Sequence, residues 1–263
     1  MNDAARDDAT VLREDAGGVA TLTLNRPRQY NAIDRATLDA LSASFERIAQ
    51  DTSVRVVVIA GAGKAFSPGH DLKELLANSN EAFVGAMFRQ CCDVMLSIRR
   101  IPQPVIAKVH GVATAAGCQL VAACDLAVAS DDARFATSGV NFGLFCATPG
   151  VAVSRDVSRK RAFEMLFTGE FIDAPTALAW GLINRVAPRD ALDEATRTLA
   201  DSLLDKPAAV MAMGKRFFYQ QLEERIDAAY RIAATTITQN MLGEDAQEGV
   251  GAFVEKRKPH WER

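Results

Sequence analysis

The sequence predicts an α/β protein with a helical C-terminal region. Short apolar segments with strand character alternate with segments of helical periodicity through most of the chain. From residue 159 onward the pattern is mostly helical, and no strand separates the last four helical segments. The 263 residues, 49% hydrophobic and 24% charged, are sufficient for one α/β domain with a helical appendage. We therefore divide the chain into a body over residues 1–200 and a helical region over residues 201–263.

Strands are predicted where apolar or alternating residues are bounded by turn-forming residues. The first two surround a Gly17-Gly18 turn. The segments 54–60 and 105–109 are nearly continuous runs of apolar, mainly β-branched residues, which is typical of strands buried on both faces of a sheet. The expected strands span residues 11–14, 19–24, 54–60, 105–109, 126–129, 134–136 and 182–186.

Helices are predicted from capping residues and from apolar residues at helical spacing. Asp34 can cap a helix of about 16 residues, and Asp71 can cap another that begins at Leu72. A longer helix ends near Arg100, and a small-residue turn at 111–117 leads into another helix. A loop is expected to continue to Gly150. The last helices are expected at residues 190–204, 207–222, 224–241 and 244–256, and helices that have no sheet to cover often form a subunit interface.

Composition excludes several classes of function. Lys and Arg number 30 against 33 Asp and Glu, and no basic block is present, which argues against nucleic acid as a partner. The least polar stretch, residues 112–130, carries Gln119 and Asp125 and predicts a buried core rather than a membrane span. The acidic amino end resembles neither a signal peptide nor a transit peptide. With five cysteines and no zinc-like spacing, we expect a reduced, cytoplasmic protein without a structural metal.

Two glycine-rich loops, residues 64–71 and 110–119, each deliver the backbone into the start of a helix. The first N–H groups of a helix have no partner within the helix and lie at the positive end of its dipole, so they suit an anionic oxygen. Two such loops that face each other would form an oxyanion hole with two donors. The alternative is that the small residues only allow tight packing before each helix.

Four segments resemble signatures of the crotonase (enoyl-CoA hydratase/isomerase) superfamily. They are Leu24-Asn-Arg-Pro27 with Asn31-Ala-Ile33, then residues 65–74, residues 108–125 and residues 252–258. Residues 113–120 and 143–150 are most similar to the branch called enoyl-CoA hydratase domain-containing proteins. The resemblance implies a crotonase-type spiral of ββα units in the body and a helical trimerisation region after it. It also implies an acyl-CoA thioester ligand, no metal or redox cofactor, and a homotrimer or a dimer of trimers.

The resemblance also implies roles for individual residues. The oxyanion donors would be the backbone N–H groups of His70 and Ala116. Three lysines match positions near the phosphates of coenzyme A in relatives, with solvated surface charges as the alternative; they are Lys64, Lys73 and Lys256. Pro68 departs from the usual Ala or Ser and could alter the path of the first loop.

Both glutamates that true hydratases use are replaced in this chain. The matching positions are Gln119 and Gly139, a further carboxylate position of isomerase relatives falls near Ala147, and residues 133–155 contain no Asp or Glu. A neutral amide can orient a water but cannot accept its proton. Each lost acid or base costs about 10²–10⁴ in rate, while a donor of an oxyanion hole is worth about 10²–10³. Efficient hydration therefore does not follow.

Other polar residues could substitute for the glutamates. The His70 side chain resembles that of relatives that decarboxylate malonyl-type thioesters, but we favour the alternative that it points away from the site or forms a hydrogen bond with the loop. Three further residues, Thr137, Ser138 and Asn141, could orient a water or a carboxylate, or could cap turns. The remaining polar candidates are expected to have structural or surface roles: Cys118 and Cys146 in the core, Asp125, His110 in a turn, and Asp93 on a solvated face.

Three functions remain open at this point. The first is a hydratase-type lyase of fatty acid metabolism with atypical catalytic groups, since enoyl-CoA hydratase is the nearest named activity. The second is another enolate reaction, chiefly decarboxylation of a malonyl-type thioester. The third is acyl-CoA binding without catalysis.

Overall fold

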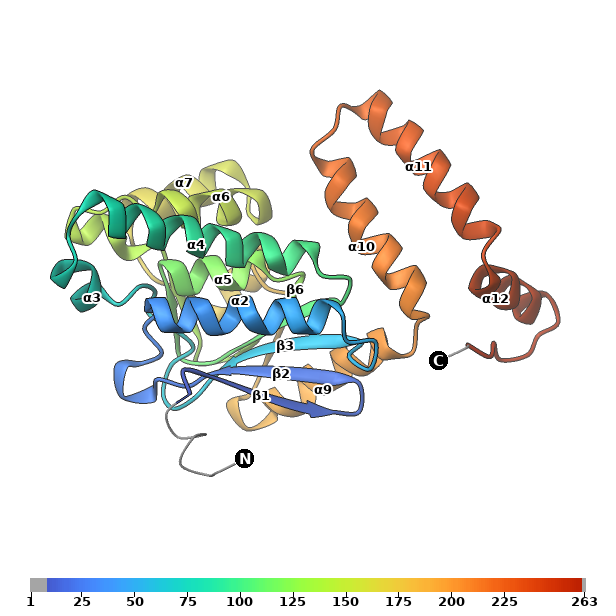
Figure 1. Cartoon of the computed structure of the whole chain (residues 1–263), viewed down its shortest axis with the longest axis horizontal. Helices are drawn as coiled ribbons and strands as arrows, with labels where there is room; N and C mark the ends of the chain where they lie inside the picture. The colour runs from blue at the N-terminus through green and yellow to red at the C-terminus, as the bar shows by residue number, and fades with distance from the viewer. Residues whose placement is uncertain (1–8, 262–263) are drawn as a thin grey trace.

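A computed structural model describes residues 9–261 of the chain (Figure 1). Its larger sheet has six strands in the order β1-β2-β3-β4-β6-β9, and a smaller sheet has the order β5-β7-β8. Strands β1 and β2 form an antiparallel hairpin, and the rest of the larger sheet is parallel. The strands are β1 (Val11–Ala16), β2 (Val19–Leu24), β3 (Val56–Gly61), β4 (Val105–Val109), β5 (Val112–Thr114), β6 (Leu126–Ser130), β7 (Arg134–Ala136), β8 (Ile172–Asp173) and β9 (Arg185–Ala187).

Helices cover both faces of the larger sheet, as the layers of Figure 1 show. Asp34 and Asp71 accept hydrogen bonds from the first turns of α2 and α3, which confirms both predicted caps. The helices are α2 (Arg35–Ala49), α3 (Leu72–Ala77), α4 (Glu81–Arg100), α5 (Ala116–Ala123), α6 (Ala147–Asp156), α7 (Arg159–Thr168), α8 (Ala174–Trp180), α9 (Leu192–Leu204), α10 (Ala208–Leu222), α11 (Ile226–Met241) and α12 (Glu244–Val254), with short 3₁₀ turns η1 (Pro27–Gln29), η2 (Ser138–Phe142) and η3 (Arg189–Ala191).

The larger sheet is buried on both sides, as the apolar runs predict. In β3, Val57 and Ile59 pack into the main core with α2, α4 and α5. The alternate residues Val56 and Val58 pack with α9 in a second cluster on the opposite face. Side chains of a strand alternate between the two faces, so a strand covered on both faces must be apolar at every position.

The ββα pattern is visible along the chain. Strands β4 and β5 lead into α5, and β6 and β7 lead towards α6, with the first strand of each pair in the larger sheet and the second in the smaller one. These units position the ends of β3, β4 and β5 next to the starts of α3 and α5.

Several predicted boundaries were wrong. The expected turn at 111–117 contains β5, because Val112 and Ala113 pair with β7. Strand β8 was not predicted, since two residues are too few to show a pattern. Helix α6 begins at Ala147 rather than after Gly150, and its proline lies in the first turn, where the missing N–H costs nothing. Strand β9 begins three residues later than expected.

Helices α10, α11 and α12 extend away from the body (Figure 1). Among their side chains only Lys215, Ala229 and Ala252 are buried. Helix α9 belongs to the body and runs to Leu204, so a division at residue 200 would cut it. Within residues 9–261, no helix is both long and apolar enough to cross a membrane.

Candidate active site

The two glycine-rich loops lie against each other. The Ser67 N–H donates to the Val112 carbonyl and the Thr114 N–H donates to the Ser67 carbonyl, each at 3.0 Å, so the first loop runs beside β5 like an added strand. At Gly69, with φ +97°, a Cβ would lie 2.9 Å from the Ala116 nitrogen. Only glycine permits this close approach. The sequence therefore brings the His70 and Ala116 backbones together, as the oxyanion-hole prediction requires.

The residues before and after His70 form backbone hydrogen bonds with Ile33, and the His70 N–H takes no part in them. Ile33 donates to the Gly69 carbonyl at 2.8 Å and accepts from the Asp71 N–H at 2.9 Å. Because successive N–H groups of an extended chain point to opposite sides, the His70 N–H points away from Ile33. Within the part of the chain that the structure describes, it donates to no protein acceptor.

The Ala116 N–H is the first of helix α5, so it has no acceptor within the helix. The preceding Ala115 has φ 48° and ψ −119°, a conformation that L-residues rarely adopt and that costs about 1–3 kcal/mol. The Ala115 N–H donates to the Ala136 carbonyl at 3.0 Å, which holds this turn against β7. The strained turn starts α5 abruptly and presents its first N–H groups to the cavity.

His70 and Ala116 both line a cavity of about 730 Å³. Among residues 9–261, no Asp, Glu, Lys or Arg lines it, and most of its wall is apolar. The lining side chains and backbone come from Pro68, His70, Leu72, Leu75, Phe88, Thr114, Ala115, Ala116, Ser138, Gly139, Asn141, Phe142, Leu144, Phe145, Cys146, Ala147, Thr148, Pro149 and Phe171. Pro68 does not divert the first loop from this site, since its carbonyl accepts from the Thr114 hydroxyl at 2.9 Å.

The His70 imidazole lies in the cavity wall. Its ring meets the Phe88 ring edge to face, with centroids 5.0 Å apart. Burial lowers its pKa from 6.5 to about 4, so the ring is neutral at pH 7. The Ile33 backbone lies near enough to the ring to raise this pKa, by less than burial lowers it. The geometry is too poor for a hydrogen bond, and neither buried ring nitrogen has a partner among the described residues. A neutral imidazole can donate one hydrogen bond and accept one, so His70 can serve a polar group of a ligand.

The two positions predicted to match the hydratase glutamates carry no acidic or basic side chain. Gln119 is buried in α5, does not line the cavity, and its Oε1 has no partner within residues 9–261. At Gly139 a Cβ would lie 2.5 Å from the Leu144 carbonyl oxygen and 2.7 Å from Cys146 Sγ. The turn through residues 139–146 therefore fills the space that a side chain at position 139 would need.

The predicted substitutes differ in their placement. Thr137 is fully buried and its hydroxyl donates to the Met165 carbonyl at 2.6 Å, so it holds α7 and does not line the cavity. Ser138 and Asn141 do line it, and the Asn141 amide also donates to the Gly169 carbonyl at 3.4 Å.

Of the three lysines, two lie in the region of the first loop. Lys73 is exposed in the first turn of α3 and Lys64 is exposed in the turn after β3. Lys256 follows α12, at the opposite end of the molecule from α3 (Figure 1). A single copy of the chain therefore does not bring Lys64, Lys73 and Lys256 together.

The residues given structural or surface roles are placed as follows. Asp125 pairs with buried Lys215, with 2.6 Å between carboxylate oxygen and Nζ. The His110 ring lies 3.0 Å from the Gly63 carbonyl oxygen. Asp93 is exposed. Burial raises the pKa of the Cys118 thiol to about 12 and raises that of Cys146, so neither is a thiolate at pH 7.

Sequence reasoning missed the aromatic part of the cavity wall. Phe88, Phe142, Phe145 and Phe171 come from three separate segments and meet only in the folded chain. The density of phenylalanine between residues 142 and 171 was the available signal.

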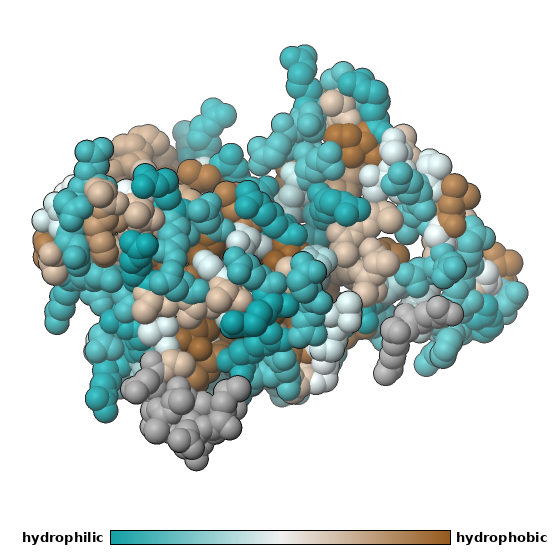
Figure 2. Space-filling view, viewed as in Figure 1, coloured by the Kyte–Doolittle hydropathy of each residue, from teal (hydrophilic) through white to brown (hydrophobic). Residues whose placement is uncertain are grey.

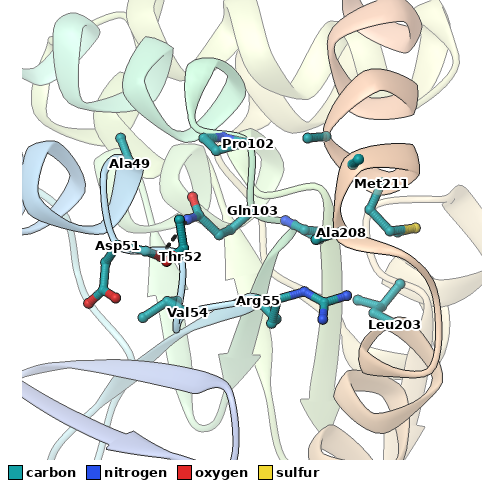
Figure 3. A pocket seen from close by; sticks show the side chains of 13 residues that line it. Ala49, Asp51, Thr52, Val54, Arg55, Pro102, Gln103, Leu203, Ala208 and Met211 are labelled. Atoms are coloured by element: carbon teal, nitrogen blue, oxygen red, sulfur yellow. Dashed lines mark hydrogen bonds between the residues drawn. The ribbon is translucent and has the colours of Figure 1, made fainter. Parts of the chain in front are cut away.

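A smaller cavity of about 230 Å³ lies between the body and α10 (Figure 3). Its polar side chains are held by the protein: the Arg55 guanidinium donates to the Lys206 carbonyl at 2.5 Å, and the Gln103 amide donates to the Ile48 carbonyl at 2.8 Å. We assign it no function. Nowhere in residues 9–261 do three His, Cys, Asp or Glu side chains gather as a metal site would require.

Comparison with known proteins shows relatives in both sequence and structure. A sequence model of the family "Enoyl-CoA hydratase/isomerase" matches residues 14–263. The chain is 45% identical over 244 residues to human enoyl-CoA hydratase domain-containing protein 3, mitochondrial, covering 93% of this chain and 80% of that protein. A solved enoyl-CoA hydratase from Mycobacterium smegmatis is 55% identical with a TM-score of 0.94, covering 96% of this chain and 98% of that one. Solved human enoyl-CoA hydratase domain-containing protein 3 is 44% identical with a TM-score of 0.93, covering 96% and 100%.

One prediction is overturned by these relatives. The human protein and its frog and rat counterparts are named mitochondrial, which contradicts the cytoplasmic location expected from the sequence. The acidic first residues and the free thiols do not determine a compartment. The family match over most of the chain, the identities and the shared fold show that this chain belongs to the enoyl-CoA hydratase/isomerase (crotonase) family.

Proposed function

We propose that the cavity binds an acyl-CoA thioester, with the carbonyl oxygen accepting hydrogen bonds from the His70 and Ala116 N–H groups. The observation that carries this proposal is the pair of unpartnered N–H groups in the wall of an apolar cavity. When an enolate forms, negative charge develops on that oxygen. Fixed donors in a site of low dielectric, aided by the positive end of the α5 dipole, stabilise this charge more than they stabilise the neutral thioester.

Enoyl-CoA hydratase is the nearest named activity, and we propose that this chain performs hydration slowly if at all. Addition of water needs a base to take the proton of the attacking water and an acid to protonate the α-carbon. No carboxylate lines the cavity, and Gly139 cannot carry one without moving the turn. The loss of two such groups lowers the rate by about 10²–10⁴ for each. Ser138 and Asn141 can still orient a water.

Decarboxylation of a malonyl-type thioester is a second candidate, favoured by His70. The bond between the α-carbon and the carboxylate breaks, its electron pair enters the enolate, and carbon dioxide leaves. The α-carbon then takes a proton from water. This reaction needs no general base for its first step, and the unpartnered His70 ring could donate a hydrogen bond that orients the carboxylate. A third candidate, acyl-CoA binding without turnover, uses the same two N–H groups.

We further propose that Lys64 and Lys73 lie near the phosphates of coenzyme A, and that a homotrimer or a dimer of trimers supplies Lys256 from a neighbouring copy. The proposed chemistry requires no metal or redox cofactor, since the N–H groups themselves stabilise the enolate.

The first test is turnover of crotonyl-, longer enoyl- and methylmalonyl-CoA by the purified protein, measured by mass spectrometry. A slow gain of one water supports the hydratase candidate. Loss of carbon dioxide that His70→Ala abolishes supports decarboxylation, and loss that survives this substitution removes His70 from the mechanism. No turnover with binding intact supports the binding protein.

The oxyanion hole itself is tested by infrared spectroscopy of a thioester labelled at its carbonyl carbon. We expect the carbonyl stretch to move to lower frequency on binding. Ala116→Pro removes one donor, and once circular dichroism shows that the variant keeps the native fold, this shift should shrink and any turnover should fall about 10²–10³-fold. Ala116→Gly keeps the N–H and is the matched control. An unshifted carbonyl in the native protein would contradict the proposal.

A further inference from the structure

The cavity has a second feature besides its two donors: a wall of large apolar side chains, four of them phenylalanines. They come from α3, α4, the end of η2 and the turn that follows it, and the segment before β8. The apolar wall consists of Leu72, Leu75, Phe88, Phe142, Leu144, Phe145 and Phe171. Phe142 is 69% exposed, and Phe145 and Phe171 are about half exposed. Large apolar side chains gathered at the mouth of a cavity indicate a surface that is covered when a ligand binds.

Neighbouring rings hold part of this wall in place. The Phe145 ring packs on the Phe167 ring with centroids 5.1 Å apart. Phe167 in turn stacks on Phe163, at 3.9 Å and nearly parallel. Apolar side chains are visible at the surface of this end of the molecule, where α6 and α7 lie (Figure 2). The cluster supports Phe145 from behind, and Phe163 and Phe167 themselves do not line the cavity.

The turn through residues 139–146 fills the space that a side chain at position 139 would need, and it also carries part of this apolar wall. The Leu144 N–H donates to the Gly139 carbonyl at 3.0 Å, and the Gly139 N–H donates to Cys146 Sγ at 3.3 Å. These bonds close the turn on Gly139 and direct Phe142, Leu144 and Phe145 to the cavity. Where the resemblance predicts the second glutamate of hydratases, at Gly139, this chain therefore has apolar surface.

Among the described residues, the lining supplies no counter-charge for a charged acyl tail. His70 is neutral at pH 7, the Thr114 hydroxyl is bonded to the Pro68 carbonyl, and Ser138 and Asn141 are uncharged. Burying an ionised group against this wall without a counter-charge is costly, whereas burying hydrocarbon is favourable.

We propose that the acyl group bound here is a hydrocarbon chain longer than four carbons, lying along Phe142, Phe145 and Phe171. This inference rests on the proposed thioester site and extends it from the carbonyl to the acyl tail. Each methylene group that becomes fully buried raises the affinity by up to about fourfold. Against a half-exposed wall, each methylene group raises the affinity by about twofold. Affinity therefore rises with chain length until the chain extends past the wall.

The test is isothermal titration of the full chain with acetyl-, butyryl-, octanoyl- and dodecanoyl-CoA, saturated esters that cannot be hydrated. We expect octanoyl-CoA to bind at least tenfold more tightly than butyryl-CoA. Phe145→Ala and Phe171→Ala should each weaken octanoyl-CoA about tenfold and acetyl-CoA less than twofold. Phe218→Ala, at a similarly exposed phenylalanine on α10 that neither lines the cavity nor belongs to this ring cluster, is the matched control and should leave the profile unchanged.

The outcomes separate this inference from the function on which it rests. Affinity that does not change with chain length, with all esters bound, would overturn the inference and leave the thioester site standing. Absence of binding by every ester would overturn both. If Phe145→Ala changes the mass of the assembly in light scattering but not the chain-length profile, the wall is a contact between copies and the inference is wrong.

Discussion

Gly139 shows how a single residue limits the chemistry of the site. We expect Gly139→Ala to lower the free energy of unfolding by about 1–3 kcal/mol, because the new methyl group would overlap the Leu144 carbonyl and Cys146 Sγ. Gly214→Ala is the control, since nothing lies within 4 Å of its Cβ, and it should stabilise the exposed helix by about 0.5–1 kcal/mol. Urea denaturation measures both. Equal effects would mean that the turn adapts freely and that a carboxylate could be restored there.

His70 predicts a specific dependence of stability on pH. Its pKa is lowered to about 4 in the folded protein, from the usual 6.5. Above pH 6.5 the ring is neutral in both states, and as the pH falls from 6.5 to 4 only the unfolded state gains the proton. The contribution of His70 to stability is therefore lost over this window, by up to about 3 kcal/mol. Other groups titrate here as well, among them His110, whose pKa is lowered, and Asp156, whose pKa burial raises to about 7, so the measured quantity is the difference between variants. The difference in stability between the native chain and His70→Gln should change by this amount between pH 6.5 and pH 4, whereas exposed His260→Gln should follow the native chain; parallel curves for all three would refute the assignment.

At the scale of elements, one buried cluster attaches α10 to the body. Lys215 donates to the Ile98 and Gln103 carbonyls at 2.7 and 2.8 Å and pairs with Asp125. The Tyr219 hydroxyl donates to the same carboxylate at 2.6 Å. Since α10 to α12 bury little else, this cluster determines how the helical region sits on the body.

We expect Lys215→Met to leave the Asp125 charge buried without its counter-charge and to cost about 3–5 kcal/mol. The loss should appear first as faster hydrogen exchange in α10 and faster cleavage between α9 and α10. Lys160→Met, at an exposed lysine on α7, is the control and should match the native chain. Unchanged exchange in the Lys215 variant would show that other contacts hold the helical region.

At the scale of the whole molecule, the helical region exposes large apolar side chains on α11 and α12 and at the turn between them. Tyr230, Leu242 and Phe253 are each more than 70% exposed. Because burial of such faces drives association, we expect three or six copies in solution, and Tyr230→Asp with Phe253→Asp should give monomers in light scattering. Leu76→Asp, equally exposed but on α3, is the control. A monomeric native protein would contradict the proposed trimer.

The sequence alone predicted much of the fold and the framework of the site. Asp34 and Asp71 cap helices, and the apolar run at 54–60 contains a strand buried on both faces. These features depend on residues a few positions apart, whose hydrogen bonding and periodicity are local. The two loops that carry His70 and Ala116 were likewise visible in the sequence, because their glycines and the helix starts that follow them lie a few positions apart.

By itself, then, the sequence determined the α/β class, the family and the lack of carboxylates between residues 133 and 155. Only the tertiary structure decided that the turn closes on Gly139, that Gln119 does not line the cavity, and that the phenylalanines gather around it. Such contacts join segments far apart in the chain, and the path of the whole chain determines which of them meet. The chemistry available to the site therefore depends on packing that no local pattern specifies.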